Sequence, residues 1–128
     1  MNNMEFDQNK YQEMQVLSYQ LKQLQSIMDS IETQLKDVKN TIDALNGFKD
    51  LKEEDEVLFP LANGIFAKGK LTDNKSLSIN IGSNIVVEKS IDDTIQMMNV
   101  QAEDMEKYKT EITSQLNKVT TKLESIQE

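Results

Sequence analysis

The stretch EVLFPLANGIFAKGKLTDNKSLSINIGSNIVVEKS, Glu56 to Ser90, decides the fold of this chain of 128 residues. Its apolar residues fall in short runs typical of β-strands, separated by the turn sequences ANG, TDNK and GSN. In the runs 65–71 and 77–81, apolar or small residues occupy alternate positions, as on a strand with one apolar face. Pro60 suits an edge strand, because it cannot donate a ladder hydrogen bond. The stretch therefore predicts two β-hairpins.

Both flanks of this stretch have the heptad pattern of coiled-coil helices. The ten a and d positions before it are all apolar, namely Met14, Leu17, Leu21, Leu24, Met28, Ile31, Leu35, Val38, Ile42 and Leu45. The apolar a and d positions after it are Ile91, Ile95, Met98, Ala102, Met105, Ile112, Leu116, Val119, Leu123 and Ile126. Only Lys109 interrupts the second series. A pattern this long predicts two helices, each with one apolar seam.

The expected organisation is a single unit over residues 1–128, with a helix over about 4–52, two hairpins over 56–88 and a second helix over 90–127. Ser90 is a candidate N-cap of the second helix. Asp92 and Asp93 follow it in the first turn, where carboxylates are favoured by the helix dipole. The second helix is therefore expected to begin sharply at Ser90.

The chain turns back after the insert, so the two helices are expected to pair antiparallel within one chain. Residue numbers of facing positions then sum to about 142, which brings Lys109 near Glu32. The Lys109 ammonium either reaches that carboxylate or extends along its own stem to water. The same register leaves the residues before Met14 without a partner helix, as either an exposed apolar tip or a frayed terminus.

Four short strands cannot bury both of their faces alone, so the hairpins are expected to assemble with those of other chains. The candidate assembly residues are the apolar side chains of the strands: Ile65, Leu71, Leu77, Ile79, Ile81, Ile85 and Val87. The predicted fold class is mostly α with a small β insert. It is a long antiparallel coiled-coil hairpin joined by two β-hairpins that form an intersubunit β-barrel platform.

Composition excludes several classes of function. The chain has no cysteine and no histidine, which removes the commonest nucleophile, general base and metal ligands. We therefore expect no catalytic, metal or cofactor-binding residues and no enzyme activity. A net charge of -8, with lysine as the only basic residue, disfavours nucleic acid and anionic membranes as partners. Because the first residues lack the features of a signal peptide, the expected location is cytoplasmic.

Two segments of the chain resemble a known family. VLFPLANGIFAKGKL, residues 57–71, resembles the strand, Pro-Leu, turn and strand segment of prefoldin subunits. NIGSNIVVEKSIDDTIQMM, residues 80–98, resembles the G-x-G-x-x-V-E-K strand of that family and the helix that follows it. Gly82 takes the first glycine position, and Asn84 replaces the second, where it can adopt the same left-handed conformation. Two hairpins are characteristic of the archaeal-type alpha subunits.

The resemblance implies a hexamer in which two alpha and four beta-type prefoldin subunits share a β-barrel platform. It implies capture of non-native proteins at the coiled-coil tips and their transfer to a group II chaperonin, without ATP, cofactor or metal. The candidate client-binding residues at the tips are Met1, Met4, Phe6, Tyr11, Met14, Leu17, Val119, Leu123 and Ile126. The last five occupy a or d positions, so packing in the seam is the competing interpretation for them.

A second interpretation comes from the residues alone. The chain is then a structural coiled-coil spacer or adaptor, oligomerised through its β insert, whose helices bind a dedicated folded partner. The two interpretations differ in one observable property. A chaperone protects unrelated unfolded proteins from aggregation, and a spacer does not.

Overall fold

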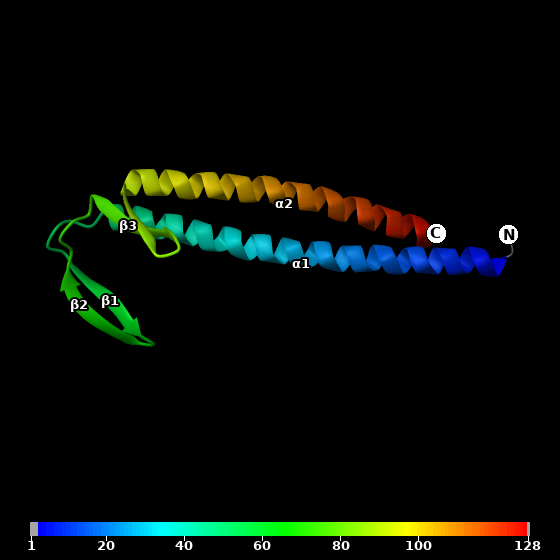
Figure 1. The fold of residues 1–128 in the computed structure, drawn as a ribbon, viewed down its shortest axis with the longest axis horizontal. Coiled ribbons are helices and arrows are strands. Elements are labelled where there is room, and N and C mark those ends of the chain that lie inside the picture. The colour runs from blue at the N-terminus through cyan, green and yellow to red at the C-terminus, as the bar shows by residue number, and fades with distance from the viewer. Residues whose placement is uncertain (1–2, 128) are drawn as a thin grey trace. The chain divides into compact units, whose positions relative to one another are not determined.

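A computed structural model describes residues 3–127, and their side chains from residue 7 onward. The elements in chain order are α1 (Asn3–Lys49), β1 (Glu56–Ala62), β2 (Ile65–Lys70), β3 (Ser76–Gly82), β4 (Ile85–Ser90) and α2 (Ile91–Gln127) (Figure 1). Two long helices with two antiparallel β-hairpins between them confirm the predicted fold class. Within residues 3–127, neither helix is long and apolar enough to cross a membrane.

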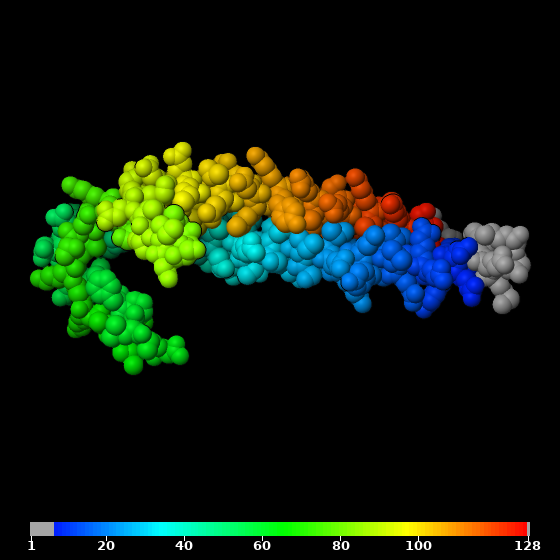
Figure 2. All heavy atoms as spheres, viewed as in Figure 1, coloured from blue at the N-terminus to red at the C-terminus, as the bar shows by residue number. Residues whose placement is uncertain are grey.

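The chain divides into two compact units. One contains Met1–Asp37 and Ala102–Glu128, and the other contains Val38–Gln101. The first unit is a pair of helical segments, seen in Figure 2 as the blue and orange-to-red spheres in contact with each other. The second unit contains both hairpins and the helix ends that flank them.

The core of the first unit is the predicted seam. The a and d side chains of the described residues are buried or half-buried, and their neighbours are almost all exposed. Leu35 and Ile112 are 4% and 3% exposed, the lowest values in the seam. In the second unit, Val38 and Ile91 are buried in the same way. Burial of this stripe supplies the hydrophobic stabilisation of both helices.

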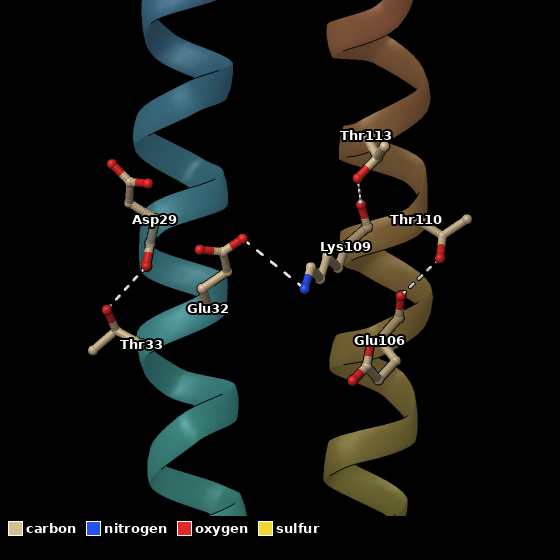
Figure 3. A network of polar contacts seen from close by, with 7 residues as sticks. All are labelled: Asp29, Glu32, Thr33, Glu106, Lys109, Thr110 and Thr113. Carbon is tan, nitrogen blue, oxygen red and sulfur yellow. Dashed lines mark hydrogen bonds and ion pairs between the residues drawn. The ribbon is translucent and has the colours of Figure 1, made fainter.

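The helices are antiparallel, and two ion pairs define their register. In the first unit Lys109 Nζ lies 3.9 Å from Glu32 Oε1, so the lysine side chain reaches the carboxylate (Figure 3). In the second unit Lys49 Nζ lies 2.6 Å from Asp92 Oδ1. The residue numbers of each pair sum to 141, one less than the predicted value. Both pairs are solvent-exposed, so each contributes at most about 1 kcal/mol.

The ends of the helices at the insert have local causes. The Asp93 backbone N–H donates to Ser90 Oγ at 3.0 Å, which confirms Ser90 as the N-cap of α2. The prediction that the first helix runs to about residue 52 was three residues too long, because α1 ends at Lys49. There the N–H groups of Asp50 and Leu51 donate to carbonyls three residues back, at 3.2 and 3.1 Å, which closes the last turn.

Each hairpin is a two-stranded antiparallel sheet with a two-residue loop. In the first loop Gly64 has a φ of 75°, a conformation that glycine adopts without strain. In the second loop Ser83 and Asn84 have φ values of 49° and 60°, which is typical of a type I′ turn. Asn84 therefore adopts the left-handed conformation that the sequence predicted. Pro60 lies in an edge strand, as expected.

Candidate functional site

The hairpin β3–β4 gathers most of its candidate assembly residues on one face. Ile79 lies opposite Val87, and Leu77 lies opposite Lys89, so these four side chains share a face. Strand alternation adds Ile85 to the same face. Ile81 lies where the register shifts between Asn80 and Gly82, and it is exposed.

The hairpin β1–β2 has apolar side chains on both faces. On one face Val57 lies opposite Gly69 and Phe59 lies opposite Ala67. The Phe59 ring covers Gly69 so closely that a Cβ at residue 69 would collide with it. Alternation places the candidate Ile65 on this face, and the candidate Leu71, half-buried, follows the strand.

The opposite face of β1–β2 was missed as an apolar surface by the sequence reasoning. Pro60 lies opposite Phe66, and Leu58 lies opposite Lys68, so this face combines three apolar side chains with the exposed Lys68. The missing signal was in the sequence, because Leu58 and Phe66 interrupt strict alternation of apolar and polar residues. Both faces of the first hairpin therefore offer apolar area to a partner.

The exposed apolar surface of the hairpins is large for so few residues. Eight bulky side chains are between 49% and 69% exposed, namely Leu58, Phe59, Leu61, Ile65, Phe66, Ile81, Ile85 and Val86. Covering what remains exposed would contribute roughly 1 kcal/mol for each, or on the order of 10 kcal/mol per chain before the costs of association. Each hairpin also forms its own sheet in the chain, so its strand edges are open to pairing.

The distal ends of the helices hold the candidate client-binding residues. Leu17 is buried, and Met14, Val119, Leu123 and Ile126 are half-buried at seam positions. Packing between the helices thus accounts for these five side chains in the single chain. By contrast, Tyr11 is 62% exposed.

The other three candidates are the most distal. Met1 lies outside the described residues; Met4 and Phe6 belong to α1, but their side chains lie outside the described part. The register that pairs Glu32 with Lys109 places the end of α2 beside Met14. Figure 1 likewise shows the start of α1 extending beyond the end of α2. The predicted overhang is therefore present as helix in the backbone from Asn3 onward.

An aromatic groove beside the seam was not anticipated. It encloses about 380 Å³ and is lined by Tyr11, Met14, Gln15, Ser18, Tyr19 and Lys22. The tyrosine hydroxyls accept hydrogen bonds from the side-chain amides one turn later, Gln15 to Tyr11 at 3.1 Å and Gln23 to Tyr19 at 3.0 Å. A search restricted to a and d positions could not find this surface, because Tyr19 lies outside the seam and is 63% exposed.

A second groove, on α2, offers no sign of chemistry. It encloses about 660 Å³ between Thr110 and Lys122 and is lined largely by hydroxyl and amide side chains. Its threonine hydroxyls donate to carbonyls of their own helix, as Thr110 does to Glu106 and Thr113 to Lys109 (Figure 3). Among residues 3–127, no cluster of acidic side chains could hold a metal ion.

Comparisons with known proteins agree with this geometry. A family model described as "Prefoldin subunit" matches residues 17–128. Prefoldin subunit alpha 1 of Methanocaldococcus jannaschii is 32% identical over 112 residues, which cover 87% of this chain and 76% of that protein. Prefoldin subunit alpha of Thermofilum pendens is 28% identical over 116 residues, covering 91% and 90% of the two chains.

A solved structure has the same fold. The cryo-EM structure of filamentous PFD from Methanocaldococcus jannaschii contains a chain that matches with a TM-score of 0.79. The match covers 91% of this chain and 96% of the other, at 14% sequence identity. At that identity the likeness concerns the fold alone.

Proposed function

The chain belongs to the prefoldin family of chaperone subunits and is of the archaeal alpha type, and from this we propose that it is part of an ATP-independent holdase. The complex captures non-native proteins at its coiled-coil tips and transfers them to a group II chaperonin in the cytoplasm. It catalyses no reaction and needs no cofactor. The observation that carries this proposal is the unpartnered apolar surface of the two hairpins.

Assembly is the first step of the proposal. Two copies of this chain and four beta-type prefoldin subunits join their hairpins into a shared β-barrel platform. The eight exposed apolar side chains and the open strand edges supply the driving force. The seven candidate assembly residues named from the sequence belong to this interface, together with Phe59, which is 49% exposed in the single chain.

Client capture is the second step. The coiled coils project from the platform, and several weak contacts around one cavity hold a non-native chain by effective concentration. The helical overhang before Met14 and the exposed Tyr11 provide contacts that the seam does not consume. Met1 and Met4 belong to the same proposed surface, and flexible methionine side chains suit binding of many different sequences.

A light-scattering assay of a thermally denatured enzyme tests the proposal. The complex of this chain with a beta-type subunit should suppress aggregation at near-stoichiometric concentration. A complex in which this chain lacks the residues before Met14 should keep its mass and protect less, because the platform lies at the other end of the helices. Scattering that the full complex leaves unchanged would favour the spacer or adaptor.

A further inference from the structure

The two hairpins are the same structural unit repeated after 20 residues. Every partner pair of β3–β4 lies 20 positions after a pair of β1–β2, from Glu56 with Lys70 and Ser76 with Ser90 to the last pair before each loop. The register shift also recurs, at Pro60/Ala62 and at Asn80/Gly82. The sequence hides this repeat, because residues 56–70 and 76–90 share only the isoleucine at positions 65 and 85.

Equal geometry means that a partner hairpin cannot choose between the two by backbone shape. The choice must come from side chains at matched positions. The sharpest difference is between Lys68 of β2 and Glu88 of β4, which occupy the same place in the repeat with opposite charges. Both are exposed, and neither has an ion-pair partner among the described residues.

We propose that two copies of this chain associate crosswise, so that hairpin β1–β2 of each copy pairs with hairpin β3–β4 of the other. This inference rests on the proposed function in one respect, namely that the hairpins drive assembly. Crosswise pairing brings Lys68 of one copy to Glu88 of the second copy, twice in a closed two-fold dimer. Pairing like with like would bring two lysines together at one site and two glutamates together at the other, which is unfavourable in a shared sheet.

The apolar residues of the repeat fit the same arrangement. Phe66 and Val86 precede the two charged residues by two positions, so they lie on the same faces as Lys68 and Glu88. Both are more than half exposed in the single chain. Each copy therefore presents an apolar residue next to a charge, and the second copy presents an apolar residue next to the opposite charge. The partner that fits each hairpin is thus the other hairpin of a second copy.

Cross-linking tests the arrangement directly, because the natural chain has no cysteine. One chain carries Lys68→Cys, and a second, distinguished by a mass tag, carries Glu88→Cys. A short bis-maleimide should join the two variants to each other when they are mixed, and should join either variant to itself several-fold less. Efficient self-linking of the Lys68→Cys chain would overturn the proposal, and so would a mixture that forms no covalent dimer.

Charge reversal tests the same contact without a cross-linker. Lys68→Glu and Glu88→Lys should each weaken self-association about tenfold, because two symmetric contacts change from attraction to repulsion. The double variant Lys68→Glu/Glu88→Lys should restore the original affinity. Reversals without effect, or a natural chain that sediments as a monomer, would refute crosswise pairing. The light-scattering assay of the complex with a beta-type subunit remains a separate test of the chaperone function.

Discussion

Replacing Ile79 by aspartate is expected to prevent assembly while leaving the helices folded. Ile79 lies opposite Val87 on the apolar face of β3–β4 and is half-buried in the single chain. Aspartate there forfeits about 1 to 2 kcal/mol of apolar burial in a shared sheet. A carboxylate that loses water without gaining a partner costs at least about 3 kcal/mol more. The sum corresponds to an association constant lowered roughly 1,000-fold or more.

The matched control is Ser78→Asp, which adds the same charge one residue earlier. Ser78 lies opposite Glu88 on the other face of the hairpin and is exposed. Native mass spectrometry of each variant with a beta-type subunit measures assembly, and circular dichroism at 222 nm measures helix content. The reasoning fails if the Ile79→Asp complex stays intact, or if Ser78→Asp disrupts assembly to the same extent.

Three further predictions concern stability, measured as the midpoint of thermal unfolding. Ser90→Ala removes the acceptor at the N-cap of α2 and should cost about 1 kcal/mol, whereas Ser90→Asn should cost little; equal losses would contradict the capping role. Lys109→Leu places an apolar side chain at the only polar seam position of α2 and should stabilise the chain by about 1 kcal/mol, because the exposed ion pair that it removes is weak. A lower midpoint would show that the pair matters more than its exposure indicates. Gly47→Ala meets open space within a helix and should stabilise by about 0.5 to 1 kcal/mol, whereas Gly69→Ala drives a methyl group into the Phe59 ring and should destabilise; the same sign for both would refute the contact.

The sequence predicted best what depends on local periodicity. The heptad pattern identified the seam, and antiparallel pairing then placed Lys109 beside Glu32 to within one residue. Local chemistry was equally informative at Ser90 and Asn84, where a capping hydroxyl and a tolerant left-handed residue have few alternatives. These features were readable because each depends on a few neighbouring residues or on one repeated spacing.

The sequence predicted less where side chains outside the repeat decide the surface. The groove between Tyr11 and Tyr19 follows one face of α1 that no heptad position marks as apolar. The cover of Gly69 by Phe59 depends on a diagonal contact across two strands, which requires the register. The equivalence of the hairpins depends on register shifts that leave almost no identity in the sequence. The client-binding and assembly residues named from the sequence therefore remain predictions about a larger complex.

The native mass and subunit composition of the complex that this chain forms in its own cells test the account most directly. Purification through a tag at moderate salt should yield a complex of about six chains, in which a second small coiled-coil subunit is in twofold excess. A homodimer or homotetramer of this chain bound to one folded protein would contradict the account, and the distal surface of α1 would then be a specific docking site.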